Sequence, residues 1–233
     1  MQEDTCSIRP LYGVYLCCLM GSYMDIIKEQ LALVHQSGLY DQTETLLMYI
    51  TLYKDNMDTF DNMVDSFDPL KKIRRITTST NEYEKFAINS FRKDIQAEEY
   101  DVYYFHTKGV SRPKGSIFER RRHILNYYTL SLPLLNRELL QTYDAVGCSL
   151  TERPSIHFSG NFWWARSSYL TKLEDAKSDY LSAEMFIGSG GGKLVSLSQT
   201  TNDGEVEMEK NRSIDIIRSE LKETAITEDW KAK

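Results

Sequence analysis

A short polar segment follows the fourth apolar run of the chain and has the composition of an anion-binding loop. It consists of His106, Thr107, Lys108 and Gly109. Lysine supplies a point charge, histidine and threonine supply hydrogen-bond donors, and glycine lets the backbone approach a ligand closely. A polar turn that merely carries a lysine would have the same composition, so a phosphate site and a simple turn both remain open.

Positive charge is concentrated directly after this segment, although the protein as a whole is acidic. The loop 111–116 contains an arginine and a lysine, and Arg120, Arg121 and Arg122 stand together where a helix is expected to begin. With Lys108, these arginines could hold a diphosphate. A solvated helix face with no ligand is the alternative.

The stretch 157–165, HFSGNFWWA, combines two indoles with several polar groups. The residues here that could stack on or hydrogen-bond a ligand such as a sugar are His157, Ser159, Gly160, Asn161, Trp163 and Trp164. Exposing an indole is unfavourable, and so is burying a polar group without a partner. Because alternate residues of a strand face opposite ways, we expect one indole in the core and the other at the site as a platform for a sugar ring. A core tryptophan pair with locally satisfied polar neighbours is the alternative.

The elements that must position these residues alternate between strands and helices. Continuous apolar runs predict strands, and apolar residues at helical spacing predict helices. In chain order the predicted elements are strand 12–20, helix 23–37, strand 44–52, helix 60–67, strand 73–77, helix 82–96 and strand 101–105. The second half is predicted to hold a helix over 127–143 that Pro133 breaks or kinks, a strand over 144–148, helices starting near residues 166 and 179, and a last strand over 194–197.

This alternation indicates an α/β fold with a largely parallel sheet and helices on both faces. Ligands of open α/β sheets bind beyond the carboxyl ends of the strands. The informative segments are therefore those that follow the predicted strands, including 20–23, 53–56 and the segment that begins at His106. Asp55 lies in one of these segments, and Tyr15 lies on the strand that leads to the first of them.

The composition favours a globular protein whose residues 1–204 form one domain. The chain has 233 residues, of which 41% are hydrophobic and 27% charged, so it can bury a sizeable core. Residues 205–233 are charged and are predicted to form a helical extension. The net charge of −6 argues against nucleic acid as the main partner, because a phosphate-binding surface is basic.

Cysteine usage and hydropathy favour the cytoplasm. The four cysteines lack C-x-x-C spacing, which indicates reduced thiols in an intracellular protein. No apolar run approaches the roughly 20 residues of a membrane span, and the polar N-terminus is unlike a signal peptide. We therefore expect a cytoplasmic protein without a membrane span.

The two polar segments together resemble those of nucleotide-sugar-dependent glycosyltransferases with the GT-A fold. The resemblance is strongest to a group of bacterial and large-virus enzymes with the segments YFHTKG and HFSGNFWWA, which stand here at 104–109 and 157–165. Further matching residues are Tyr169, Leu170, Leu173, Ala183, Glu184 and Ile187. The resemblance covers about residues 12–190 and implies a single-domain, GT-A-like Rossmann-type open sheet, mostly parallel and mixed at one edge.

This resemblance implies a hexosyl- or deoxyhexosyltransferase that moves a sugar from a nucleoside diphosphate to a glycan or glycoconjugate acceptor. By position, residues 159–161 would shape the donor-sugar and acceptor site, and Glu184 would be the general base of an inverting displacement. Tyr15 and Asp55 would contact the base and ribose of the donor. A glutamate beside indoles can have the raised pKa that a base requires, whereas at a helix start it can serve only the helix dipole. Asp175 and Asp179 are nearby alternatives for the base.

One departure from the wider GT-A families concerns the metal. Those families carry an Asp-x-Asp motif at the strand end that corresponds to 101–105, where it holds Mn²⁺ or Mg²⁺ on the donor diphosphate. This chain has His106, Thr107 and Lys108 there. Lys108 and the arginines could neutralise the diphosphate without a metal, and His106 would be at most a single ligand. Metal dependence is open, and metal independence is favoured.

Two other classes of function fit parts of the pattern. One is a non-catalytic carbohydrate- or nucleotide-binding module on the same scaffold. The other is a different doubly wound enzyme, such as a methyltransferase or dehydrogenase, but no G-x-G-x-x-G follows Met20. The glycine-rich segment 189–193 lacks the spacing of a phosphate-binding P-loop and is predicted to be a flexible loop.

Overall fold

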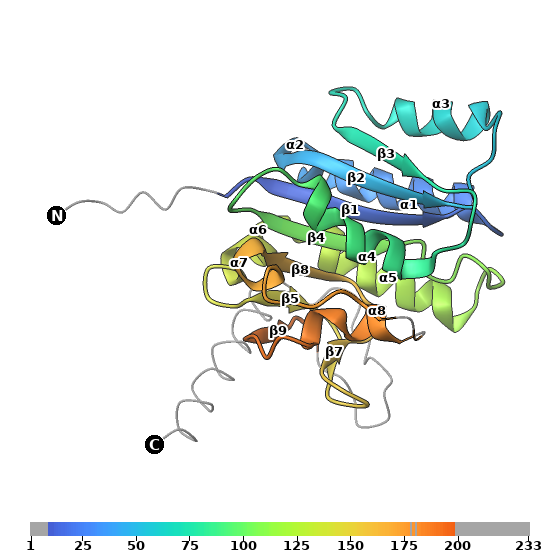
Figure 1. Ribbon diagram of the computed structural model, residues 1–233. Helices are drawn as coiled ribbons and strands as arrows, with labels where there is room; N and C mark the ends of the chain where they lie inside the picture. The colour runs from blue at the N-terminus through green and yellow to red at the C-terminus, as the bar shows by residue number, and fades with distance from the viewer. Residues whose placement is uncertain (1–8, 178, 180, 199–233) are drawn as a thin grey trace, which may run out of the picture.

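The fold is built on a mixed sheet of seven strands (Figure 1). The computed structural model describes residues 9–177, 179 and 181–198. The strands of this sheet are β1 (Leu11–Cys18), β2 (Thr43–Thr51), β3 (Ile73–Thr77), β4 (Asp101–His106), β5 (Ala145–Gly147), β8 (Trp163–Arg166) and β9 (Leu194–Ser196). Their order is β3-β2-β1-β4-β8-β5-β9. A second small sheet pairs β6 (Leu150–Thr151) with β7 (His157–Phe158).

The direction of each strand decides which strand ends lie at the same edge of the sheet. β1, β2, β3 and β4 are parallel, β5 and β9 are parallel to each other, and β8 is antiparallel to both β4 and β5. The mixed part therefore lies towards β9, as expected, and the reversed strand is interior. Because β8 is reversed, it begins at the edge where β4 ends, with Trp163 opposite Tyr104.

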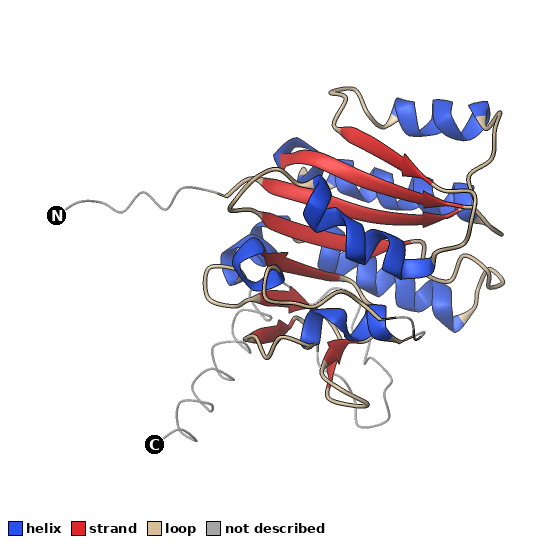
Figure 2. Ribbon diagram, viewed as in Figure 1, coloured by secondary structure: helices blue, strands red, loops and turns tan. Residues whose placement is uncertain are grey.

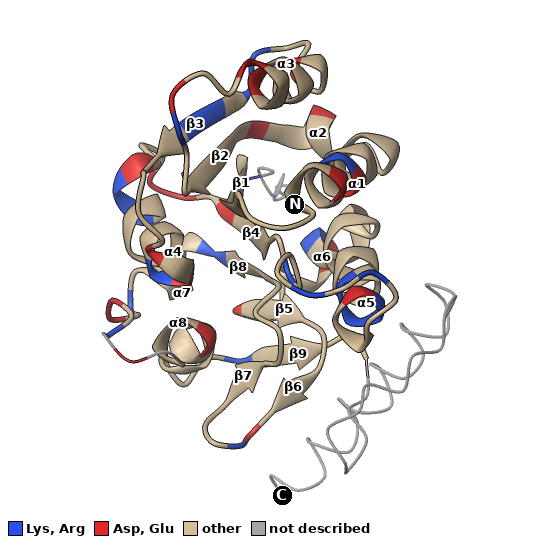
Figure 3. Cartoon of the chain, turned by 90° about the vertical axis from the view of Figure 1, so that its right-hand side faces the viewer, with Lys and Arg blue, Asp and Glu red and all other residues tan. Residues whose placement is uncertain are grey.

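Helices cover both faces of the sheet, as the alternation predicted (Figure 2). One face carries α1 (Tyr23–Gln36), α2 (Leu39–Gln42), α3 (Asp58–Ser66), α5 (Ile117–Leu130) and α6 (Pro133–Leu139). The other face carries α4 (Tyr83–Asp94), α7 (Ser167–Leu170), α8 (Ser182–Met185) and the 3₁₀ turn η1 (Phe186–Gly188). Figure 3 looks onto the carboxyl ends of the parallel strands and shows α4 and α8 on one side of the sheet and α1 and α5 on the other.

Each face of the sheet packs its own hydrophobic core, which explains the sequence of the central strands. Tyr15 and Cys17 of β1 belong to the core under α1, whereas Val14 and Leu16 belong to the core under α4. A strand that is buried on both sides has no polar face, so it appears as a continuous apolar run.

The predicted break of the helical stretch 127–143 at Pro133 is confirmed, and the structure has two helices there. α5 ends at Leu130, and α6 begins at Pro133. Proline lacks the amide hydrogen that a helix interior needs and disfavours helical geometry in the residue before it. Leu132 accordingly has non-helical angles, and Pro133 occupies the start of a new helix, where its missing donor does no harm.

The stretch 157–165 is likewise divided. β7 ends at Phe158, β8 begins at Trp163, and residues 159–162 turn the chain between them. Gly160 and Asn161 have φ angles of 98° and 55°, which belong to left-handed geometry and end the extended strand. We call residues 159–162 the β7–β8 turn.

Several other expectations concern the whole chain. None of the helices in the described ranges has both the length and the apolar character that a membrane crossing requires. Cys17, Cys18 and Cys148 are free thiols. The predicted helical extension at 205–233 lies outside the described residues.

Candidate functional site

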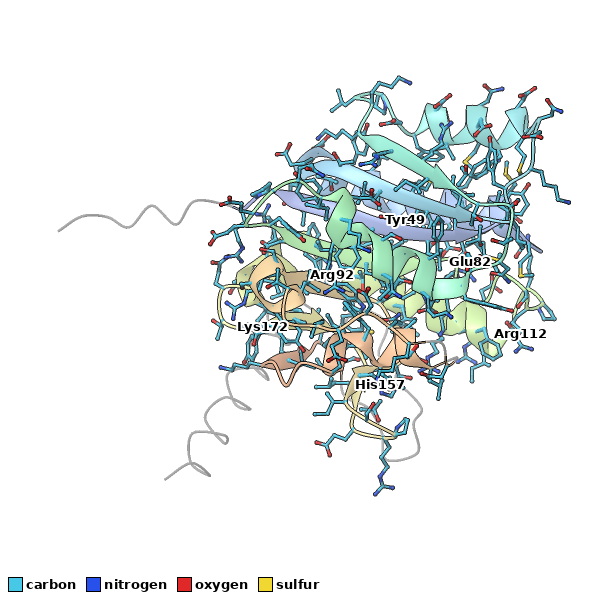
Figure 4. The ribbon with its side chains drawn as sticks, viewed as in Figure 1. Tyr49, Glu82, Arg92, Arg112, His157 and Lys172 are labelled. Carbon is cyan, nitrogen blue, oxygen red and sulfur yellow. The ribbon has the colours of Figure 1, made fainter. Side chains whose placement is uncertain are left out.

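Several predicted site residues converge on the carboxyl edge of the sheet, where β4 ends and β8 begins. His106 and Lys108 come from the end of β4, and the β7–β8 turn lies beside them. α4 and α8 approach the same place from one face, and α5 approaches from the other. Figure 4 labels Glu82, at the start of α4, and Arg112, in the loop before α5, at this end of the molecule.

His106 is a buried link between β4 and the turn. His106 is only 8% exposed, and its ring Nε2 donates a hydrogen bond to the Gly160 carbonyl at 3.0 Å. Because a carbonyl only accepts, Nε2 carries the ring hydrogen. Burial holds the pKa of His106 below its usual range, partly opposed by Glu84, whose Oε1 lies 3.7 Å from Nε2. The imidazole is therefore neutral at neutral pH and orients the turn.

Lys108 is a partly buried cation with a carboxylate from each of two helices nearby. Burial lowers the pKa of the Lys108 ammonium, and the charges of Glu84 and Glu184 act in the opposite direction. The positive charge of Arg121 lowers the pKa of Lys108 further, because two like charges repel each other. Two cations and two carboxylates thus share a small region at the carboxyl edge.

Of the three consecutive arginines of α5, only Arg121 contacts the β7–β8 turn in the described part of the chain. Its NH2 group donates to the Ser159 hydroxyl, while its buried Nε has no hydrogen-bond partner among the described residues. Arg120 is exposed to solvent. Arg122 is buried and donates to Glu29 at 3.0 Å. Successive helix residues point about 100° apart, so three neighbours cannot share one role.

The β7–β8 turn is fastened to both acidic residues. Gly160 N–H donates to Glu184 Oε1 at 2.6 Å, and the Asn161 side-chain amide donates to Glu84 Oε2 and, at 3.2 Å, to the Ala183 carbonyl. Asn161 Oδ1 in turn accepts from the Trp163 indole at 2.8 Å. Glu184 is therefore placed against the turn by a backbone donor, which fixes the direction of its carboxylate.

Two expected ligand contacts are wrong in the structure because the side chains are internal. Tyr15 is fully buried, its ring stacks on Phe105 at 4.1 Å between centroids, and its hydroxyl donates to Gln30 at 2.7 Å. Thr107 is also buried, and its hydroxyl accepts from the Cys18 amide at 3.0 Å, which ties β4 to β1.

The two tryptophans are also both core residues, so the expected sugar platform is wrong. Trp163 stacks on Tyr104 at 5.1 Å in one core. Trp164 belongs to the opposite core and donates to the Thr129 carbonyl at 2.8 Å. Alternation does place the indoles on opposite faces, but helices cover both faces, so neither indole reaches solvent.

Other candidates lie nearby or apart. His157 is buried on β7 with Nδ1 donating to the Ser155 carbonyl at 2.7 Å, and Figure 4 shows it below the sheet edge. Asp55 is exposed in the loop after β2. Of the alternative bases, Asp175 is paired with Arg92 and Asp179 is exposed. In the described part of the chain, no hydrogen bond or ion pair joins these four to the cluster around Lys108.

The site contains one acidic residue that the sequence did not single out. Glu84 lies in the first turn of α4, directly after β3, at the carboxyl edge where ligands of such sheets bind. This position after a predicted strand is the signal in the sequence that could have identified Glu84. Beneath the site, a buried network was also missed: Gln30 donates to the His106 carbonyl at 3.0 Å and to Asn126 Oδ1 at 2.9 Å.

The groups at the end of β4 do not fit a divalent metal. Such ions need several oxygen or nitrogen ligands at one point. Here Lys108 is a cation, the Thr107 hydroxyl accepts from a backbone amide, and His106 Nε2 donates to a carbonyl. Within the ranges that the structure describes, no group of three His, Cys, Asp or Glu side chains is placed to hold a metal ion.

Comparison with solved structures shows which known proteins have a similar fold. It is similar to the mannosyltransferase PcManGT from Pyrobaculum calidifontis, solved in complex with GDP-Man and Mn²⁺, with a TM-score of 0.50, 13% identity, and coverage of 82% of this chain and 55% of that one. It is also similar to a 4-diphosphocytidyl-2C-methyl-D-erythritol synthase from Anaerococcus prevotii, with a TM-score of 0.45, 13% identity, and coverage of 90% and 95%. The sheet is thus of the GT-A-like Rossmann type.

Sequence comparison gives the family. No curated protein matches the chain. Residues 19–210, which are most of the sequence, match a family described only as a domain of unknown function, DUF8361. The chain spans 55% of the length of the mannosyltransferase, so likeness to that enzyme concerns a part of it. The protein belongs to the DUF8361 family.

Proposed function

We propose that this protein is a glycosyltransferase that moves a sugar from a nucleoside diphosphate to a hydroxyl group of a glycan acceptor. The observation that carries the proposal is that Lys108, at the end of β4, and Arg121, bound to Ser159 of the β7–β8 turn, both stand at the carboxyl edge of the sheet. Arg121 keeps a buried Nε without a hydrogen-bond partner among the described residues. A buried guanidinium donor without a partner is unfavourable, and an anion bound beside Arg121 would supply an acceptor.

The diphosphate of the donor is the anion that we place there. Transfer of the sugar leaves a nucleoside diphosphate with additional negative charge, and preorganised cations stabilise that charge in the transition state. Lys108 and Arg121 supply these cations where a divalent metal would otherwise act. Asp55, in the loop after β2, remains our candidate for contact with the nucleoside.

Glu184 is the proposed general base. Its Oε1 is held by the Gly160 amide, and in the described part of the chain no hydrogen bond reaches Oε2. Oε2 is therefore available to take the proton of an acceptor hydroxyl while that oxygen attacks the sugar. A single base that serves direct displacement gives inversion at the anomeric carbon.

The fold supports this proposal without deciding it. The similar mannosyltransferase binds GDP-Man, and that property is carried over here as a hypothesis. The segment at 104–109 supplies Lys108, and the segment at 157–165 supplies the turn that binds both Arg121 of α5 and Glu184 of α8.

The test is a panel of UDP-, GDP- and dTDP-sugars, screened by thermal shift and by release of nucleoside diphosphate with and without Mn²⁺. We expect one nucleotide to raise the melting temperature, and Lys108→Met and Arg121→Met to reduce that increase. Arg120→Met is the matched control, because this exposed neighbour should leave the increase unchanged. If no nucleotide sugar binds, the proposal fails.

A non-catalytic binding module is the competing function. It predicts binding of the donor, no release of diphosphate with any acceptor, and equal donor binding in wild type and Glu184→Gln. An enzyme predicts turnover in the wild type that Glu184→Gln abolishes while donor binding persists. Turnover therefore separates the two functions.

A further inference from the structure

We propose that Glu84 is a second functional carboxylate of this site, which accepts a hydrogen bond from a hydroxyl group of the transferred sugar and so selects the donor. This inference rests on the proposed function. It assigns the donor sugar to the side of α4 and leaves Glu184, on α8, to the acceptor. Three groups of observations support it.

The first observation is that one oxygen of Glu84 is fixed and the other is available. Oε2 accepts from the Asn161 amide. Oε1 is 3.7 Å from His106 Nε2, which is too far for a hydrogen bond, and Nε2 already donates to Gly160. The side chain is 27% exposed, so a ligand at the carboxyl edge can reach it.

The second observation is the charge distribution around Glu84. An ionised carboxylate only accepts hydrogen bonds, so it repels a phosphate and binds a hydroxyl. Glu84 lies 3.7 Å from His106, two residues before the proposed phosphate-binding Lys108, and its charge opposes the lowering of the Lys108 pKa by burial. A nucleotide sugar satisfies both groups at once, with its phosphates on the cations and its sugar hydroxyls on the carboxylate.

The third observation is that the surroundings hold Glu84 rigidly. Asn161, which binds Glu84, is itself bound to the Ala183 carbonyl and to the Trp163 indole. Tyr104, stacked on that indole, has a fully buried hydroxyl with no hydrogen-bond partner among the described residues, and burial, together with the charge of Glu84, raises its pKa. A preorganised carboxylate loses little freedom when a hydroxyl binds, which favours discrimination between sugars.

The experiment compares binding of three probes by thermal shift and calorimetry. The probes are the best donor from the panel, its nucleoside diphosphate alone, and deoxy analogues of that donor that each lack one hydroxyl. Wild-type protein should bind the donor more tightly than one particular deoxy analogue, by about 10-fold or more. Glu84→Ala should bind the donor and that analogue equally, while its affinity for the nucleoside diphosphate alone stays within about 2-fold of wild type.

Two variants keep the result interpretable. Glu84→Gln retains an oxygen that can accept from Asn161, so it should fold like the wild type and still lose part of the discrimination. Glu82→Gln, two residues earlier in an exposed position bonded to Thr80, should behave as wild type with every probe.

A separate measurement checks the link between Glu84 and the turn in the absence of any ligand. If Glu84 holds Asn161, the melting temperature of the double variant Glu84→Ala/Asn161→Ala should lie close to that of the more destabilised single variant. Additive losses in melting temperature would overturn this part of the inference.

The outcomes separate this inference from the proposed function. If no nucleotide sugar binds to the wild type, the proposed function and this inference both fail. If the donor binds and Glu84→Ala keeps full discrimination among the deoxy analogues, only the role of Glu84 is overturned. If Glu84→Ala weakens the nucleoside diphosphate as much as the donor, Glu84 acts on the phosphate region and the inference is also overturned.

Discussion

At the scale of single residues, the two carboxylates of the site are held by different partners and should respond differently to mutation. Glu184 is bound to a backbone amide of Gly160, and Glu84 to a side-chain amide of Asn161. A Glu→Gln change keeps the size of the side chain and removes its ability to take a proton. This allows chemistry to be tested separately from folding.

We predict that Glu184→Gln lowers kcat for sugar transfer by about 100-fold or more, because the acceptor hydroxyl loses its base. The KM for the donor should change little, since Glu184 is assigned to the acceptor. Steady-state kinetics with the best donor measures both quantities. Asp175→Asn is the control, because its partner Arg92 lies outside the cluster around Lys108. A larger effect of Asp175→Asn than of Glu184→Gln would contradict the assignment.

A second prediction concerns His106 and acid. Its folded-state pKa is lowered by burial, whereas the unfolded chain takes up a proton at about pH 6.5. The unfolded state therefore binds more protons as pH falls below about 6.5, and this part of the stability is present above that pH and lost below it.

We expect the melting temperature to fall between about pH 7 and pH 5, and His106→Gln to flatten this slope. Gln can still donate to the Gly160 carbonyl but does not titrate. Melting curves across the pH range give the slopes, and His123→Gln is the control because His123 is exposed on α5. Equal slopes in wild type and His106→Gln would show that another group causes the loss.

At the scale of elements, the β7–β8 turn depends on a close approach to α5. Gly160 has a φ of 98°, and a Cβ there would lie 2.8 Å from Leu125 Cδ1. Gly115, in the loop before α5, has a similar φ of 78° but nothing within 4 Å of a Cβ. An alanine at either position would strain the backbone to a similar degree. Only the alanine at position 160 would also clash with a neighbouring side chain.

The prediction is that Gly115→Ala destabilises the protein by about 1 kcal/mol, the usual penalty of left-handed geometry. Gly160→Ala should be worse by about a further 1–3 kcal/mol because of overpacking against Leu125. Urea unfolding measures both. Should the two variants lose equal stability, the contact with α5 does not constrain the turn.

Most elements follow from local sequence pattern, and the turn within 157–165 is the main exception. The strands β1 to β4 and the helices α1, α3 and α4 match the predicted order, since their apolar spacing shows which residues are buried. The break at Pro133 is also local, because proline itself cannot continue a helix. The turn within 157–165 depends on which residues meet α5 and the sheet, and pattern alone did not contain that information.

At the scale of the whole molecule, the start of β4 is an electrostatic junction between distant segments. Asp101 is buried, and Arg9, before β1, donates to it at 2.7 Å. Arg137, on α6, lies 3.7 Å from the same carboxylate. Burial raises the pKa of Asp101 despite these cations, so the charged form depends on them.

We expect Arg9→Met to destabilise the protein by about 2–3 kcal/mol at neutral pH, because it leaves a buried carboxylate undercompensated. Since the pKa of Asp101 is raised in the folded state, its charge is unfavourable there, and protonation at lower pH relieves it. The loss caused by Arg9→Met should therefore shrink as pH falls.

The matched control is the partly exposed pair of Arg74 and Asp94, joined at 3.1 Å. Arg74→Met should cost less than about 0.5 kcal/mol, because exposed ion pairs contribute little. Denaturant unfolding at neutral and mildly acidic pH measures all variants. A loss from Arg9→Met that is independent of pH would exclude Asp101 as its cause.

The sequence by itself determined the α/β fold, and it predicted the edge of the sheet where the candidate site lies and several groups of that site. Alternation of apolar runs requires a parallel sheet, and strand ends that carry His106 and Lys108 must then meet near one edge. These conclusions depend only on local spacing, which the chain displays directly.

Only the tertiary structure decided which polar side chains face the site and which are internal. Tyr15, Trp163 and Trp164 resemble ligand contacts in sequence, but helices on both faces bury them. Glu84 has no distinctive local pattern and becomes significant because Asn161, distant in sequence, lies against it. Contacts between distant segments decide which side chains face the site, because the packing of helices on the sheet determines which groups are buried and which form hydrogen bonds.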